Sequence, residues 1–409
     1  MKKLKYLLLL ILLLPISVFA LDDIDLYSKA YIIYDSTDDR VLIKKDNDKQ
    51  NYIASTTKMM SILVALDSID NLDTKVTIEQ SWLNTVPWDA YKMGLKAGDE
   101  VTYKDLLYGT MLPSAADAVN SLAMATNGSI RTFVKKMNDK ATEIGMKNTN
   151  FTNPIGMDDN NDINHHSTAD DLLVLVKYAL KDDRFKEVYE TKEYTLTNGF
   201  KAVASSKSFG DQKGINTDRI IGAKTGFTDK AGFCLAYEFK AHDHTYYAVT
   251  LGAPVENFRD FKHLRDANTV IDYIENNYEY KTLFKKDDVY KAIQVNDSTI
   301  DYYDVKYKED LTLLLPIDFK MEDLRIENDL LYDISYKFKK GDKLGTVKMY
   351  YQDELIYSED FYLEETIKPS ITGFIKNSVI LCSIMVVAFT ILVISLMILI
   401  KRKTKKVVK

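Results

Sequence analysis

Apolar and polar positions alternate near the start of the chain and then change to a helical spacing. Residues 30–34 and 41–43 are apolar runs around the turn residues Asp38 and Asp39, which is typical of a β-hairpin. From Ser55 to about Leu180, apolar side chains recur every three or four residues and predict helices. Three strand patterns and one helical pattern follow, at residues 194–196, 221–237, 245–251 and 258–274. Strands, helices and strands closed by a helix predict one α+β unit that ends near residue 280.

Both ends of the chain carry apolar segments of different lengths. At the N-terminus three lysines precede the run Leu7–Leu14, and small residues stand at the positions that a signal peptidase reads, Val18 and Ala20. Residues 1–20 are therefore predicted to be an export signal. An uncleaved anchor is the alternative, but the apolar run is shorter than the ~20 residues that a membrane span needs.

The segment Ser378–Ile400 contains no charged residue and is predicted to cross a membrane. As a helix it would be about 34 Å long, which matches the thickness of the hydrocarbon layer. The basic tail 401–409 follows at once, so the positive-inside rule places it in the cytoplasm and everything before Ser378 outside. We therefore expect a single-pass protein of the cell membrane with its large domain on the extracytoplasmic side. A buried core helix, the alternative, would not need a basic stop.

Between these parts, residues 289–363 show short strand patterns separated by turn signals, of which Lys340-Gly341-Asp342 is the clearest. They predict a small all-β domain over about 287–365. This region contains no pairing of a nucleophile with a base. We interpret it as a spacer that holds the first domain, residues 25–280, away from the bilayer.

Composition narrows the classes of function. With 46% apolar and 28% charged residues, the chain can bury a sizeable core and is not disordered as a whole. The net charge is −6 although both ends are basic, so the body is acidic and nucleic acid is not an expected partner. Two cysteines, Cys234 and Cys382, build neither a disulfide framework nor a thiolate metal site.

A candidate nucleophile lies where the first helix is predicted to begin. Ser55 and Lys58 are three residues apart, so on a helix they share a face and come within reach of each other. A serine hydroxyl needs an adjacent base, and a lysine can serve if burial and nearby positive charge keep it neutral. This pattern alone is weak, because a serine cap followed by a solvated lysine has the same spacing.

Two further elements strengthen the interpretation. Ser114, in Leu112-Pro113-Ser114, lies on a loop between two helical patterns and supplies a second hydroxyl. Lys224-Thr225-Gly226 lies inside the apolar strand predicted at 220–237. A charged residue there is costly unless it faces a partner, and the glycine allows a ligand to approach the backbone closely.

In this order, the three elements resemble the active-site motifs of penicillin-recognising serine enzymes. The resemblance is to the low-molecular-mass penicillin-binding proteins that are D-alanyl-D-alanine carboxypeptidases. It covers residues 25–280 well and the β region more loosely, and it extends to the sequence around each motif, at residues 53–60, 93–100, 105–109, 112–114, 153–158 and 224–232. It implies a β-lactamase/transpeptidase-like α+β fold, an antiparallel sheet flanked by helices, before the all-β domain and the membrane helix.

The resemblance implies a role for each motif residue. Ser55 attacks the penultimate D-alanine of a peptidoglycan pentapeptide and releases the terminal D-alanine, and Lys58 is its base. Ser114 relays a proton to the leaving amine.

The resemblance implies that the third motif, Lys224-Thr225-Gly226, binds the substrate. Lys224 and Thr225 hold the terminal carboxylate. Gly226 leads into Phe227, whose N–H forms the oxyanion hole with that of Ser55. β-Lactams acylate such enzymes, and no metal or cofactor is implied.

Departures from the family pattern leave two alternatives open. The usual Ser-x-Asn motif has Ala116 at its third position, which removes an amide expected to bind the substrate and to steady Lys58, and so suggests an impaired wall-binding scaffold. A β-lactamase of the same fold is the other alternative. It is disfavoured because no glutamate lies between Glu143 and Glu187, where the deacylating residue of class A enzymes belongs. The residue after Lys-Thr-Gly, often histidine, is Phe227.

The histidines are interpreted as non-catalytic. His242 and His244 fall in a predicted hairpin turn and are expected to be solvated, with no carboxylate or cysteine partner evident for a metal. The pair His165-His166 is expected on a polar rim or surface loop. Cys234 is expected to be a small core residue.

Overall fold

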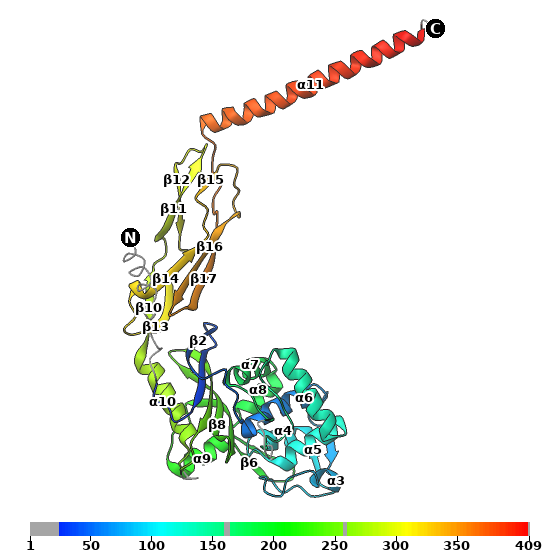
Figure 1. The fold of residues 1–409 in the computed structure, drawn as a ribbon, viewed down its shortest axis with the longest axis vertical. Coiled ribbons are helices and arrows are strands. Elements are labelled where there is room, and N and C mark those ends of the chain that lie inside the picture. The colour runs from blue at the N-terminus through cyan, green and yellow to red at the C-terminus, as the bar shows by residue number, and fades with distance from the viewer. Residues whose placement is uncertain (1–23, 159–163, 257–259, 408–409) are drawn as a thin grey trace, which may run out of the picture. The chain divides into compact units, whose positions relative to one another are not determined.

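The computed structural model describes residues 24–158, 164–256 and 260–407, and the chain divides into two compact units, Met1–Glu279 and Tyr280–Lys409 (Figure 1). The predicted export signal lies outside the described residues. The domain limits 25–280 and 287–365 remain predictions.

The first unit is built on a five-stranded antiparallel sheet with the strand order β2-β1-β9-β8-β7. Ile32 pairs with Val249 and Ile33 with Ile43, and the β1–β2, β7–β8 and β8–β9 pairs each contain one register shift. The strands are β1 (Ala30–Asp35), β2 (Arg40–Lys45), β7 (Ile220–Thr228), β8 (Gly232–Ala241) and β9 (His244–Ala253). Two small two-stranded sheets accompany it, formed by β3 (Lys75–Thr77) with β4 (Glu100–Thr102) and by β5 (Glu193–Thr195) with β6 (Lys201–Val203).

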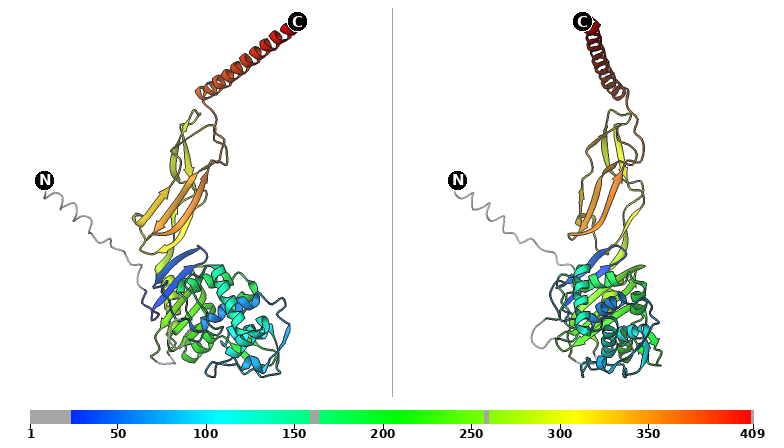
Figure 2. Two further views of the ribbon diagram at one scale, coloured as in Figure 1. Left: turned by 45° about the vertical axis from the view of Figure 1, so that its right-hand side comes forward. Right: turned by 90° about the vertical axis from the view of Figure 1, so that its right-hand side faces the viewer.

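Helices lie on both sides of this sheet. α10 (Lys262–Asn277) packs on β8 and β9, and the larger helical group lies on the other side, where α7 (Ala169–Ala179) contacts β1 and β9 (Figures 1 and 2). The remaining helices are η2 (Ala54–Thr57), α2 (Lys58–Leu66), α3 (Gln80–Leu83), α4 (Tyr103–Met111), α5 (Ala116–Asn127), α6 (Ile130–Ile144), α8 (Asp183–Glu190) and α9 (Ser205–Lys213).

Helix α2 lies at the centre of the helical group. All nine of its residues are buried, whereas α6 buries only Phe133, Met137 and Ala141. An amphipathic helix such as α6 belongs at a surface, and one that is apolar on every side belongs in the core. Lys58 is thus carried into the core by the helix that begins at it.

The element predictions are confirmed with three corrections. The hairpin of β1 and β2, the helical middle and the α+β order are as predicted. The prediction of one strand at 221–237 is wrong. This segment forms two strands, β7 and β8, joined by a turn in which Gly232 has φ +67°. The short strands β3 and β4 interrupt the helical region, and the last helix begins at Lys262, later than predicted.

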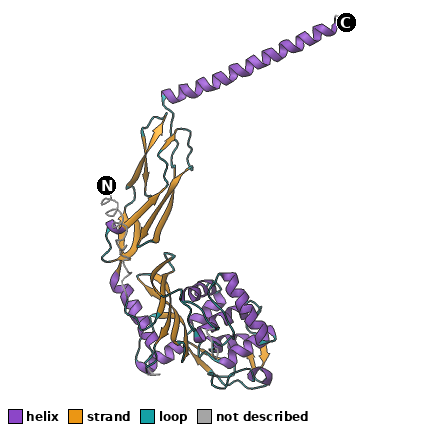
Figure 3. Cartoon of the chain, in the orientation of Figure 1, coloured by secondary structure: helices purple, strands orange, loops and turns teal. Residues whose placement is uncertain are grey.

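The second unit consists of strands followed by one long helix (Figure 3). Its own core includes Ile293, Leu344 and Val347, all fully buried. The elements are β10 (Tyr278–Phe284), β11 (Val289–Asn296), β12 (Tyr302–Lys306), β13 (Leu311–Pro316), η3 (Met321–Asp323), β14 (Leu324–Asn328), β15 (Asp333–Ser335), β16 (Lys343–Tyr351), β17 (Glu354–Tyr362) and α11 (Ile371–Val407). This confirms the prediction of a small all-β domain before a C-terminal helix.

Helix α11 is a candidate membrane span. Its segment Ile371–Ile398 is 28 residues long, and the most apolar 18-residue window in it has a mean hydropathy of 2.9 and is not buried against the rest of the described protein. The core helix of a soluble domain would be buried. Length and apolar character are therefore consistent with membrane anchoring.

Candidate active site

Ser55 is presented by a strained junction between a loop and a helix. Ala54, the residue before it, has φ +46°, a region that residues with a Cβ rarely adopt. Its carbonyl packs against Gly156, where an added Cβ would lie 2.0 Å from the Ala54 oxygen. Gly156 is itself at φ +86°, so only glycine fits this contact.

Lys58 reaches Ser55 directly. Its Nζ lies 2.8 Å from Ser55 Oγ and 2.7 Å from the carbonyl oxygen of Ile155. Burial, and secondarily the charge of Lys224, lower the pKa of Lys58 well below its usual value. A neutral amine in this position can donate one N–H to Ile155 and accept the hydroxyl proton of Ser55 on its lone pair.

Ser114 lies on the short segment between α4 and α5 with its backbone in the left-handed region, at φ +65°. Its Oγ is buried and has no hydrogen-bond partner among the described residues. The neighbouring backbone is held firmly, because Ala116 N–H donates to Tyr91 O and the Asp117 carboxylate accepts three backbone N–H groups of residues 93–95. A strained backbone and an unsatisfied buried hydroxyl are features of functional positions.

Lys224 lies on β7 and is completely buried. Its Nζ donates to the carbonyl oxygen of Thr225 at 2.9 Å, and burial lowers its pKa to about 7. The Thr225 hydroxyl makes a short hydrogen bond with Ser205 at the start of α9. At Gly226 an added Cβ would lie 3.1 Å from the Ser55 nitrogen, so the strand runs directly beside the proposed nucleophile.

These residues surround one pocket of about 470 Å³. Of the seven residues expected at the site, six line it: Ser55, Lys58, Ser114, Thr225, Gly226 and Phe227. Lys224 does not line it, but lies close enough for its charge to act on Lys58. The local geometry and the long-range contacts therefore bring together the elements that acyl transfer needs.

Two polar groups that form hydrogen bonds with these residues were not predicted from the sequence. The Ile155 carbonyl is a backbone group, and the only signal for it was the similarity of residues 153–158 to the family. Ser205 gave no signal at all, since a serine at the start of a helix is common.

Ala116 lies in an apolar environment. It is buried with Val119 and Ile155, and Met157 packs against this cluster. The amide that the family places here was expected to steady Lys58, and the second hydrogen bond of Lys58 goes instead to the Ile155 carbonyl.

The surface position expected for His165 is wrong. This residue is buried, its Nε2 lies 2.8 Å from Thr57 Oγ1, and its Nδ1 accepts the backbone N–H of Thr152. It ties the loop before α7 to the helical turn that carries Ser55. Cys234 is confirmed as a buried core residue, and burial raises the pKa of its thiol to about 12.

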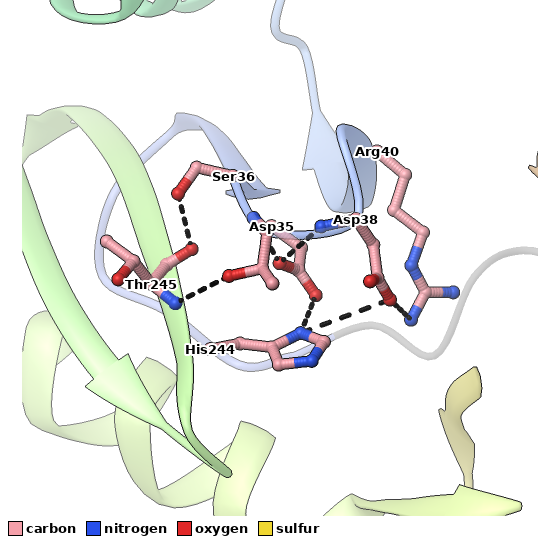
Figure 4. A network of polar contacts seen from close by, with 7 residues as sticks. Asp35, Ser36, Asp38, Arg40, His244 and Thr245 are labelled. Atoms are coloured by element: carbon pink, nitrogen blue, oxygen red, sulfur yellow. Dashed lines mark hydrogen bonds and ion pairs between the residues drawn. The ribbon is translucent and has the colours of Figure 1, made fainter. Parts of the chain in front are cut away.

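The expectation for His244 is also wrong, because it is buried and has carboxylate partners (Figure 4). Its Nδ1 lies 2.6 Å from Asp35 and 3.9 Å from Asp38, which in turn faces Arg40. The ligand atoms of Asp35, Asp38 and His244 lie within 4.8 Å of one another. Asp35 also accepts the backbone N–H groups of Thr37 and Asp38, so its oxygens are used internally.

This network fits a structural role, fastening the β1–β2 hairpin to β9. None of its residues lines the pocket. Residues 241–244 do form the predicted hairpin turn, with His242 and Asp243 in the left-handed region.

Comparison with known proteins identifies both units. Residues 17–255 match the family model for D-alanyl-D-alanine carboxypeptidase, and residues 278–369 match the C-terminal domain of penicillin-binding protein 5. The D-alanyl-D-alanine carboxypeptidase DacF of Bacillus subtilis is 28% identical over 356 residues, 85% of this chain and 87% of the relative. The D-alanyl-D-alanine carboxypeptidase of a Streptomyces species is 35% identical over 211 residues, 48% of this chain and 70% of the relative.

Solved structures agree in fold. Penicillin-binding protein 5 from Haemophilus influenzae is 24% identical, with a TM-score of 0.62, and the match covers 84% of this chain and 98% of that one. A Streptomyces DD-transpeptidase, solved as a point mutant, is 28% identical with a TM-score of 0.52, over 61% of this chain and 98% of that one. The family binds peptidoglycan stem peptides and β-lactams. The chain belongs to the D-alanyl-D-alanine carboxypeptidase family, the low-molecular-mass penicillin-binding proteins.

Proposed function

We propose that this chain removes the terminal D-alanine from peptidoglycan stem peptides through an acyl-enzyme on Ser55. The observation that carries the proposal is the buried, desolvated amine of Lys58, 2.8 Å from the Ser55 oxygen in a pocket that Thr225 also lines. Membership of the carboxypeptidase family supports the same reaction.

The first step is attack by Ser55. Neutral Lys58 takes the hydroxyl proton while Ser55 Oγ bonds to the carbonyl carbon of the penultimate D-alanine. The negative charge that develops on the carbonyl oxygen is stabilised by the backbone N–H groups of Ser55 and Phe227.

The tetrahedral intermediate then breaks down. Ser114 passes a proton to the nitrogen of the departing D-alanine, and the peptide bond breaks to leave an ester on Ser55. Lys224 and Thr225 hold the terminal carboxylate throughout. Water, activated by the same amine, hydrolyses the ester and regenerates the serine. A penicillin would follow only the first part of this path and remain attached.

We place the reaction outside the cell. The apolar character of α11 and the basic residues that follow it support a single crossing with the C-terminus in the cytoplasm. Residues 1–20 would be removed during export. Accessibility of the catalytic unit to protease in intact cells, with the C-terminal tail protected, is the expected result; the reverse pattern would contradict this topology.

The test uses the full chain in detergent micelles with a defined pentapeptide ending in D-Ala-D-Ala and, separately, a fluorescent penicillin. We expect release of D-alanine and covalent labelling, both abolished in Ser55→Ala. Ser61→Ala is the matched control, since Ser61 lies on α2, which directly follows η2, but is fully buried and hydrogen-bonded to Pro154 O at 2.7 Å. Labelling of Ser55→Ala would refute the assignment, and peptide binding without release would favour the wall-binding scaffold.

A further inference from the structure

A histidine that the reaction described above does not use lies at one wall of the pocket. His263 is the second residue of α10, is 0% exposed, and lines the pocket that contains Ser55 and Thr225. It is a buried polar side chain inside the site, so its hydrogen-bonding groups need an explanation.

Both ring nitrogens of His263 lack a hydrogen-bond partner among the residues that the structure describes. The ring stacks on Phe233 with centroids 4.7 Å apart, and Phe261 meets it edge-on at 6.2 Å. Burial lowers the pKa of His263 to about 3, so the imidazole is neutral and has one N–H donor and one acceptor nitrogen. Aromatic contacts fix the ring but satisfy neither nitrogen.

The lining of this pocket favours an anion. Besides His263 it contains Lys201 of β6, Ser205 and Ser208 of α9 and Thr225 of β7, all of which carry donors. The one carboxylate among the described lining residues, Asp89, belongs to the loop before Tyr91 instead. Ser205 also begins a helix of nine residues, whose N-terminal dipole adds positive potential.

We propose that His263 is a substrate-recognition residue for the terminal D-alanine, where its ring N–H donates a hydrogen bond to the substrate's terminal carboxylate. This rests on the proposed function, which places that carboxylate at Thr225. Phe227 and Phe233, whose ring centroids are 5.0 Å apart, connect this wall to the strand beside Ser55. His263 then acts on binding and not on the acyl-transfer step.

The experiment measures kcat and KM of the full chain in detergent for two pentapeptides, one ending in D-alanine and one in D-alaninamide. In His263→Phe we expect KM for the acid peptide to rise by about tenfold or more with kcat changed by less than about twofold, as loss of a hydrogen bond to a charged group predicts. The amidated peptide keeps only a neutral carbonyl, which is a weaker acceptor, so its KM should change clearly less between wild type and variant.

Tyr237→Phe is the matched control. The Tyr237 hydroxyl is also buried without a partner in the described chain, but it lies outside the pocket, so its removal should leave both constants unchanged. His263→Leu repeats the measurement with a side chain that cannot overpack, in case the phenylalanine variant does not fold.

Unchanged KM for the acid peptide in a folded variant would overturn the inference, as would an equal loss for both peptides, which would mean that the ring only shapes the pocket. Failure of the wild type to release D-alanine or to bind penicillin would overturn the proposed function itself. The two failures are therefore distinguishable, since the second appears without any change at His263.

Discussion

Two walls of the pocket each bury a lysine, and the two amines make different contacts. On the α2 wall, Lys58 has two acceptors, the Ser55 hydroxyl and the Ile155 carbonyl. On the β7 wall, the amine of Lys224 donates to the carbonyl of its own neighbour, Thr225, and lies behind the pocket lining. Desolvation is the largest influence on both pKa values. Only the pKa of Lys58 is lowered further by the charge of the other lysine. This supports Lys58 as the proposed base and Lys224 as a nearby positive charge.

The comparison shows how one residue type can serve two purposes without a carboxylate partner. Burial alone makes each amine easier to deprotonate, and the contact made by each nitrogen decides what the amine can do. The substrate carboxylate would be the missing counter-charge for the β7 wall.

Removal of the proposed base, Lys58, should have the largest effect on the reaction rate. We expect Lys58→Met to lower the rate of acylation by penicillin, and of D-alanine release, by about 10³-fold, within the range for loss of a positioned base. Lys192→Met is the matched control, because burial also lowers the pKa of Lys192 and its Nζ donates to the carbonyl of Ile220, outside the pocket. A loss of similar size in the control would mean that buried lysines are needed for folding instead.

Removal of the amine of Lys224 should have a smaller effect on the reaction rate. In Lys224→Met we expect kcat/KM to fall by roughly ten- to a hundredfold, as when a charged partner of a carboxylate is lost. The pKa of Lys58 should rise, because a nearby positive charge no longer opposes its protonation. The acidic limb of the pH profile of penicillin acylation should therefore move to higher pH, and a limb near pH 7 that belongs to Lys224 should disappear.

The Lys224→Met variant should also change how the stability of the protein depends on pH. The pKa of Lys224 is about 7 in the folded protein, below its ordinary value of 10.5, so the folded state binds fewer protons between these values. Wild-type stability must then fall as the pH drops from 10.5 towards 7. Lys224→Met should remove the part of this dependence that comes from Lys224 and raise the melting temperature at pH 7. A pH profile of acylation that matches the wild type would contradict the coupling of the two lysines.

The smallest effect is expected at Ala116. Because Lys58 already donates to Ile155, we expect Ala116→Asn to change kcat/KM by less than about tenfold, although the family carries an amide there. The new amide enters an apolar cluster with Val119 and Met157, so we expect about 1–3 kcal/mol of lost stability. Paired melting curves and pentapeptide kinetics measure both quantities. A gain well beyond tenfold would show that Ala116 impairs the enzyme.

The sequence predicted the parts of this site that depend on local geometry. Ser55 and Lys58 meet because residues three apart share a helix face, which needs no knowledge of the fold. Lys58 and Lys224 are far apart in the sequence, and only the resemblance to a family indicated that they lie close together. Ser205 and His263 join the pocket through contacts between distant elements, which no local pattern encodes.

Two errors in the prediction have identifiable causes, one local and one long-range. The apolar stretches of β7 and β8 are separated only by the short polar segment Thr228–Lys230 and by Gly232, and this turn signal was overlooked when the two strands were merged into one. His244 looked like a turn residue because its partners, Asp35 and Asp38, lie more than 200 positions earlier in the sequence.

Gly156 sets a limit on how antibiotic resistance could arise in this enzyme. A side chain there would collide with the carbonyl of Ala54, immediately before the proposed nucleophile Ser55. A substitution that spared the enzyme from β-lactams by shifting this loop would also displace the serine that its wall substrate requires. A mutation at Gly156 would therefore disable the enzyme's own reaction together with its acylation by the drug.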